Sequence, residues 1–355
     1  MFLKTLIFPL TNPDMKILLL LLNVPLFCYV VGGSDCRKEP QCSITRVHKM
    51  KSGNCYDRKF RSFPKCLATD VEVIDLTFNR IRKVSKTDMS KFSYLKFLYL
   101  ADNLITNLEE DVFEDLSGLT TLDLSLNALQ KVPVSVFKLP ALTSLYLGQN
   151  LNINIADALD MARPLKSPLT KIDISRTTDE ENYSVFPDFG ILPYLVVLNI
   201  TENYYYTLTP SLFMGFCNLK TLDSANVTTE FEDPCDCWRL NTWLKNRKVK
   251  FTLFKCTVIE SRCLDNDLTN EDLLIHEKCS EMYKSNELKH TINTILIGVG
   301  STLAVMVFIL LIVFYRRRRR IKRNGQLRKN QTERTQNDAL KHLNNQQICI
   351  PNEYS

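Results

Sequence analysis

One leucine pattern recurs along the middle of the chain and constrains the fold more than any other feature. The pattern Leu-x-x-Leu-x-Leu-x-x-Asn-x-Leu fits four segments closely, which begin at Val71, Leu95, Leu119 and Leu142. Three weaker copies begin at Leu169, Leu195 and Leu219, and successive copies start 23 to 27 residues apart. Self-similarity at such a period indicates a stack of repeated units that bury one continuous core between them.

The alternation inside each copy predicts a short strand. In the third copy, Leu122 and Leu124 alternate with Thr121 and Asp123. Successive side chains of a strand point to opposite faces, so the leucines are expected to face the interior and the polar residues to face outward. Strands of successive copies are then expected to stack in parallel.

Two further residue types recur at fixed places in the copies. An asparagine follows four of the predicted strands, where the chain turns and leaves backbone groups unpaired: Asn79, Asn103, Asn127 and Asn150. A side-chain amide both donates and accepts, so these residues are expected to form a buried ladder. A phenylalanine recurs on the returning side of the copies and is expected to fill the wide part of each coil: Phe92, Phe113, Phe137, Phe189 and Phe213.

These copies resemble the extracellular leucine-rich-repeat family over roughly 210 residues of the chain. The resemblance implies an α/β repeat fold: a curved leucine-rich-repeat solenoid of about seven repeats, with strands on the concave face and disulfide caps at the ends. The run CRKEPQC…NCYDRKFRSFPKC resembles the N-terminal cap of the family, and DPCDCWRLNTWLKN resembles its C-terminal cap. In the latter, Trp238, Leu240, Trp243 and Leu244 are expected to form the apolar face of a covering helix.

Ten cysteines lie between the two long apolar segments, an even number that suits an oxidising compartment. In the N-terminal group the pairing is open, and Cys36–Cys42 with Cys55–Cys66 is a guess. In the C-terminal group the resemblance implies Cys235–Cys256 and Cys237–Cys279, which leaves Cys217 and Cys263 for each other. Zinc at Cys235-x-Cys237 is a weaker alternative, because no nearby histidine completes a tetrahedral site.

Residues 292–315 form an uncharged apolar run that is long enough to cross a bilayer as a helix. Arg316 to Arg320 follow at once, and such a charge excess stays on the cytoplasmic side. A second apolar run, residues 17–31, is short and precedes small residues near Gly33, so we expect a cleaved signal peptide; an uncleaved anchor is the alternative. The chain is therefore expected to be a type I single-pass protein of the plasma membrane with its N-terminus outside.

These features predict the following organisation: a signal peptide (1–33), an N-terminal cysteine cap (34–66), leucine-rich repeats (67–232), a C-terminal cysteine cap (233–280), a juxtamembrane stalk (281–291), a transmembrane helix (292–315) and a basic cytoplasmic tail (316–355). The tail carries eleven Lys and Arg against three acids, more than the whole net charge of +6. The folded body is therefore slightly acidic, which argues against a nucleic-acid partner.

The sequence does not predict an enzyme. The four histidines lie in no metal-binding pattern, and neither a Gly-x-Ser-x-Gly motif nor a phosphate-binding loop lies outside the membrane. We expect no cofactor, no resident metal and no catalytic residue.

A rigid face of parallel strands favours binding, because little ordering entropy is lost when a partner docks. Aromatic residues among acids on the outward side of the strands are the candidate ligand-binding residues: Phe97, Tyr99, Asp123, Tyr146 and Asp173. Exposed rings carry much of the binding energy at interfaces. Surface tyrosines without a partner are the plain alternative.

Three glycosylation sequons lie on the predicted extracellular side, at Asn182, Asn199 and Asn226. Asn199 is expected to point outward from a strand. A glycan there would obstruct the sixth repeat and leave repeats one to four for a protein ligand.

The sequence thus predicts a cell-surface adhesion or recognition receptor that binds an extracellular protein or glycoconjugate. The polar tail holds no signalling domain of its own, so a cytoplasmic adaptor would have to supply one. Two alternatives stay open: an auxiliary subunit or co-receptor that acts laterally on a channel or larger receptor, and a decoy that does not signal.

Overall fold

The computed structural model describes residues 41–263 and 268–346, with only the backbone described for 342–346. The expected signal peptide, Cys36 and the last nine residues lie outside this range. The chain forms two compact units, one ending at Leu268 and the other beginning at Thr269.

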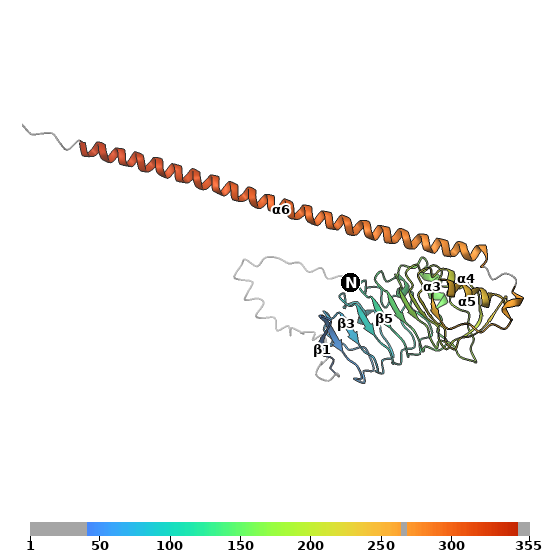
Figure 1. Ribbon diagram of the computed structural model, residues 1–355. Helices are drawn as coiled ribbons and strands as arrows, with labels where there is room; N and C mark the ends of the chain where they lie inside the picture. The colour runs from blue at the N-terminus through green and yellow to red at the C-terminus, as the bar shows by residue number, and fades with distance from the viewer. Residues whose placement is uncertain (1–40, 264–267, 347–355) are drawn as a thin grey trace, which may run out of the picture. The chain divides into compact units, whose positions relative to one another are not determined.

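The first unit is a leucine-rich-repeat solenoid built on one ten-stranded sheet (Figure 1). Its strands, in spatial order, are β1 (Ser43–Val47), β2 (Met50–Asn54), β3 (Val73–Asp75), β4 (Phe97–Tyr99), β5 (Thr121–Asp123), β6 (Ser144–Tyr146), β7 (Lys171–Asp173), β8 (Val197–Asn199), β10 (Thr221–Asp223) and β12 (Lys250–Phe251). All neighbours from β2 onward pair in parallel, whereas β1 and β2 form an antiparallel hairpin. The parallel stack that the repeats predict is confirmed.

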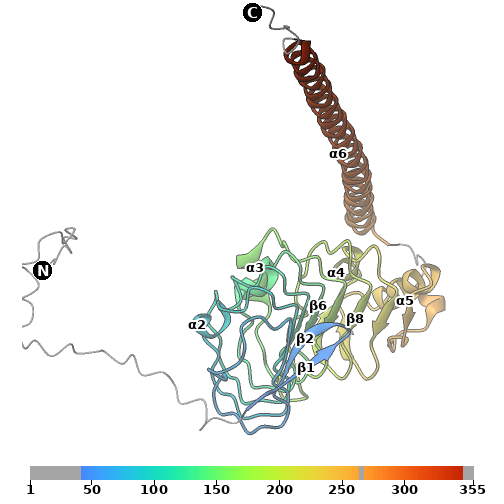
Figure 2. The same ribbon diagram turned by 90° about the vertical axis from the view of Figure 1, so that its left-hand side faces the viewer.

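Short helices lie on the returning side of the coils, opposite the sheet (Figure 2). They are α2 (Lys86–Met89), the 3-10 helix η1 (Val134–Lys138), α3 (Ala156–Ala162) and α4 (Ser211–Met214). A second, two-stranded parallel sheet joins β9 (Tyr204–Leu208) to β11 (Thr228–Phe231) in the last repeats. Near the C-terminal end lie α5 (Asp236–Asn246) and the 3-10 helix η2 (Glu260–Arg262).

The core consists of the inward leucine rows. The middle residues of the repeat strands face one another in register and are fully buried: Ile74, Leu98, Leu122, Leu145, Ile172, Leu198 and Leu222. Full burial of such a side chain contributes about 1.5–3 kcal/mol relative to leaving it in water. The recurring phenylalanines of the returning side are buried as well, as expected: Phe92, Phe113, Phe137, Phe189 and Phe213.

The asparagine ladder is present and extends beyond the four predicted members. Asn103 donates to the carbonyls of Leu76 and Leu100 and accepts from the N–H of Ile81, so one amide joins two coils. Asn203, which is not one of the four predicted members, repeats this arrangement in the sixth copy. In the fifth copy Thr177 stands at the position of the asparagine, and its hydroxyl donates to the carbonyl of Ile174.

The residue before each ladder position has a left-handed backbone: Phe78, Asp102, Leu126, Gln149, Arg176, Glu202 and Asn226 have φ between 52° and 60°. None of them is glycine, and such a conformation is uncommon for a side chain that carries a Cβ. The same turn therefore recurs in all seven copies, and in the copies that keep the asparagine its amide donates to carbonyls beside this turn.

Each end of the stack is covered by a disulfide-bonded segment. At the N-terminal end the β1–β2 hairpin turns through His48 and Lys49, both with positive φ, and β2 pairs with β3. At the other end α5 buries Leu240 and Leu244, while its two tryptophans are only half buried. Asn241 of α5 donates to the carbonyl of Phe254 and accepts from its N–H, which fixes the chain after β12.

The disulfide pairing that we expected at the N-terminal end is wrong. Cys42 bonds Cys55, which contradicts both Cys36–Cys42 and Cys55–Cys66. The hairpin explains this pairing: Ser43 lies opposite Asn54, so the next residues outward, 42 and 55, also face each other with 4.4 Å between their Cα atoms. Cys66 is also disulfide-bonded.

The pairing that we expected at the C-terminal end is wrong too. Cys235 bonds Cys263 and Cys237 bonds Cys256, in place of Cys235–Cys256, Cys237–Cys279 and Cys217–Cys263. Cys237 lies on the buried side of α5 with its sulfur 3.7 Å from the carbonyl of Phe254, two residues before Cys256. Cys217 and Cys279 are disulfide-bonded as well, and the bonds at Cys235 and Cys237 overturn the zinc alternative.

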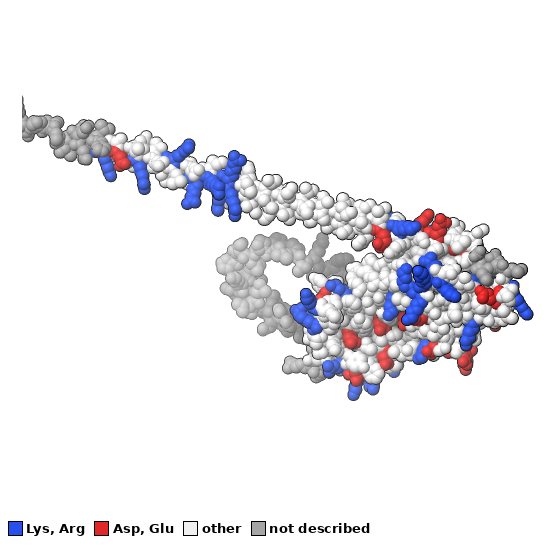
Figure 3. Space-filling view, in the orientation of Figure 1, with Lys and Arg blue, Asp and Glu red and all other residues white. Residues whose placement is uncertain are grey.

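The second unit is one continuous helix, α6 (Asn270–Gln346). Within the part of the chain that the structure describes, it is the one helix long and apolar enough to cross a membrane. It includes the expected stalk and runs through the apolar segment as far as Gln346, and the side chains of residues 316–341 are exposed. A band of α6 without charged side chains is followed by clustered Lys and Arg (Figure 3).

Candidate functional site

The outward face of the ten-stranded sheet brings the predicted ligand-binding residues together. The last residues of the repeat strands form one row in register: Asp75, Tyr99, Asp123, Tyr146, Asp173, Asn199 and Asp223. Phe97 begins β4 two residues before Tyr99 and therefore points to the same side of the sheet. All five candidates are half buried, so each keeps part of its surface in contact with solvent.

Tyr99 lies between Asp75 and Asp123 in this row. Partial burial raises the pKa of its hydroxyl, and the neighbouring Tyr146, Asp123 and Asp75 raise it further. The Tyr99 hydroxyl therefore stays protonated at neutral pH and can donate a hydrogen bond to a partner.

Tyr146 contacts a lysine that was not among the predicted site residues. The Lys171 ammonium of β7 lies 4.9 Å from the centre of the Tyr146 ring. A cation over a ring face is attracted by the ring quadrupole, so the pair presents a positive charge and an apolar surface together. The strand register could have identified it, since Lys171 pairs with Ser144, two residues before Tyr146.

The two candidate carboxylates also have a structural role. One oxygen of Asp123 accepts from the N–H and hydroxyl of Ser125, and Asp173 makes the same bonds with Ser175. The other oxygen of Asp173 accepts from the side-chain amide of Asn199. These carboxylates hold the turns that follow their strands, so the rings of Phe97, Tyr99 and Tyr146 are the stronger anchors for a partner.

The three sequons differ in their surroundings. Asn182 and Asn226 are exposed, whereas Asn199 is half buried in the outward row. The Asn199 amide nitrogen, which would carry the sugar, donates to Asp173 over 3.0 Å.

If the solenoid faces the secretory lumen, exposed sequons should be used. We expect Asn182→Gln and Asn226→Gln each to remove one glycan, seen as one step of electrophoretic mobility that disappears after deglycosylation. Asn330→Gln, in the predicted cytoplasmic tail, is the control and should cause no step. A mobility step at Asn330 with none at Asn182 and Asn226 would reverse the proposed orientation.

The described residues contain no group of three His, Cys, Asp or Glu side chains arranged to hold a metal ion.

Comparisons with known proteins match the repeats. The Leucine rich repeat family model matches residues 93–151. The platelet glycoprotein Ib alpha chain of Mus musculus is 30% identical over 155 residues, which are 42% of this chain and 20% of that protein. Leucine-rich repeat-containing protein 3 of Danio rerio is 29% identical over 175 residues, 48% of this chain and 64% of that protein.

A solved internalin structure from Listeria monocytogenes superposes with a TM-score of 0.41 at 19% identity, covering 53% of this chain and 48% of that one. The chain spans less than two thirds of the length of each of these proteins.

Proposed function

We propose that this chain, a leucine-rich-repeat membrane protein, is a type I single-pass cell-surface receptor that binds an extracellular protein through the concave face of its repeats. The observation that carries the proposal is the outward side of the sheet, where the half-exposed rings of Phe97 and Tyr99 on β4 and of Tyr146 on β6 flank Asp123 of β5. A glycoconjugate is the second ligand class that such a face would suit.

The orientation follows from charge and chemistry. Residues 292–315 carry no charge, and five arginines follow at once, which retains the C-terminal side in the cytoplasm. The disulfides of the solenoid require an oxidising compartment on the other side. We therefore propose the segment boundaries given above, with residues 34–291 outside the cell.

Signalling would depend on other proteins. The side chains of residues 316–341 are exposed on α6, so they build no core that could house a catalytic or adaptor-type domain. A cytoplasmic adaptor that binds the basic tail would transmit the signal after the ligand binds.

If the protein is a decoy, removal of residues 316–355 will leave its cellular effect unchanged.

Two variants distinguish a receptor from a helper that acts laterally through its membrane helix. The first lacks residues 67–232, and the second keeps the repeats but carries an unrelated apolar sequence in place of residues 292–315. A labelling enzyme fused before residue 34 would identify neighbouring surface proteins on intact cells. For a receptor, we expect the first variant to lose its specific neighbours and the second to keep them; the opposite pattern would identify a lateral helper.

A further inference from the structure

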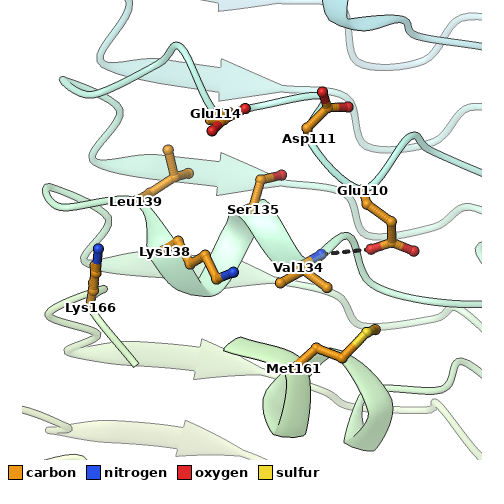
Figure 4. Close-up of a pocket in the computed structure, with 9 residues that line it drawn as sticks. All are labelled: Glu110, Asp111, Glu114, Val134, Ser135, Lys138, Leu139, Met161 and Lys166. Atoms are coloured by element: carbon orange, nitrogen blue, oxygen red, sulfur yellow. Dashed lines mark hydrogen bonds between the residues drawn. The ribbon is translucent and has the colours of Figure 1, made fainter. Parts of the chain in front are cut away.

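A cleft of about 680 Å³ opens on the returning side of the solenoid, away from the concave face (Figure 4). It lies where the segment with Glu110, η1 and α3 come together from successive coils. Its lining residues are Glu110, Asp111, Glu114, Val134, Ser135, Lys138, Leu139, Met161 and Lys166. Its volume is in the range of pockets that hold small organic ligands.

The carboxylates at one end of the cleft already have partners. Glu110 pairs with Lys131 and accepts from the N–H of Val134, and these bonds lower the pKa of its carboxyl. Lys86 lies 2.8 Å from Asp111 and 2.9 Å from Glu114. The acidic end is thus largely neutralised from within the protein.

The two lysines that line the cleft have no such partner. Within the described residues, neither the Lys138 nor the Lys166 ammonium makes an ion pair or a side-chain hydrogen bond. Both side chains are exposed and both line the cleft. An anion that enters would therefore meet two uncompensated positive charges.

Ser135 adds a buried hydroxyl to the lining. The residue is only 6% exposed, and its hydroxyl has no hydrogen-bond partner in the part of the chain that the structure describes. A buried polar group without a partner is costly, so natural proteins rarely keep one without a reason. Figure 4 shows this hydroxyl pointing away from η1, on the side of Asp111 and Glu114.

The remaining lining is apolar. Val134 and Leu139 are buried, while the Met161 side chain of α3 is 58% exposed. Methionine adapts its shape readily and suits contact with a flat apolar body.

We propose that this cleft binds a small organic anion, with its acidic head at Lys138 and Lys166, a hydrogen bond from the Ser135 hydroxyl, and its apolar body against Val134, Leu139 and Met161. The site is separate from the concave face and does not depend on the function proposed for that face.

The test uses the full chain in nanodiscs of phosphatidylcholine, with 2-naphthalenesulfonate as the anionic probe and empty discs as the blank. We expect saturable binding that weakens at least about tenfold in Lys138→Gln/Lys166→Gln, because both charge-assisted contacts are lost. Lys83→Gln/Lys245→Gln removes the same charge from exposed sites outside the cleft and should bind as the natural chain does.

Ser135→Ala separates a binding role from a structural one. The substitution removes an unpaired buried hydroxyl, so it should leave Tm unchanged or raise it while it weakens binding of the probe. Absence of binding to the natural chain, equal binding by the two lysine double variants, or equal affinity for the neutral 2-naphthalenesulfonamide would each overturn the proposal.

Discussion

Replacing Asn150 with alanine should destabilise the solenoid by at least about 3 kcal/mol, because three buried backbone groups lose their partners at about 1–3 kcal/mol each. Asn150 is fully buried. Its amide donates to the carbonyls of Leu124 and Leu147, and its carbonyl accepts from the N–H of Leu129. One side chain thus links the third and fourth coils at the point where both turn out of their strands.

Thermal unfolding of the purified chain checks this expectation. For a folded body of this size, a loss of about 3 kcal/mol corresponds to a fall in Tm of roughly 6–12 °C. Gln130→Ala is the matched control, since it removes an exposed amide near the same coil and should change Tm by less than about 2 °C. Equal Tm values for the two variants would show that the ladder does not hold the coils together.

Most of the fold could be predicted from the period of the repeat. It predicts the parallel stack, the inward leucine rows and the outward row, because a two-residue alternation in each copy leaves only one way to bury Leu98, Leu122 and Leu145 together. It also predicts the asparagine ladder in the copies that match well. Asn203 stands at the asparagine position of the sixth copy, so the pattern contained the signal for it, whereas Thr177 was missed because a hydroxyl replaces the amide.

The disulfides could not be paired from spacing. Cys235 and Cys237 are two residues apart at the start of a helix, where such neighbours point in different directions. Their partners therefore depend on which side of α5 faces the chain after β12. The cleft could not be predicted from the sequence either. Its lining residues Glu110, Ser135 and Met161 come from different coils and from segments without a repeated pattern.

The candidate site was predicted in part. Outward alternation and register place Tyr99 and Tyr146 in one row, but the stacking of Lys171 on Tyr146 and the bonds of Asp123 and Asp173 to their own turns required side-chain positions. Whether this face binds a ligand is still a prediction.

The double substitution Tyr99→Ala/Tyr146→Ala should abolish ligand binding while the protein still reaches the cell surface. Both rings are half exposed, so their removal opens no cavity in the leucine core. Aromatic anchors at the centre of an interface typically contribute 2 kcal/mol or more each, and loss of two such anchors would weaken binding by roughly a thousandfold. Tyr56→Ala/Tyr206→Ala is the matched control, since it removes two exposed rings that lie outside the outward row.

Photo-crosslinking on intact cells measures this directly, with a photoreactive residue at Thr121, which lies in register between Phe97 and Ser144. The natural chain and the Tyr56/Tyr206 control should give the same crosslinked extracellular protein, and the Tyr99/Tyr146 variant should give none at equal surface level. An undiminished crosslink in the Tyr99/Tyr146 variant, or no crosslinked protein with any of the three chains, would contradict recognition through the concave face.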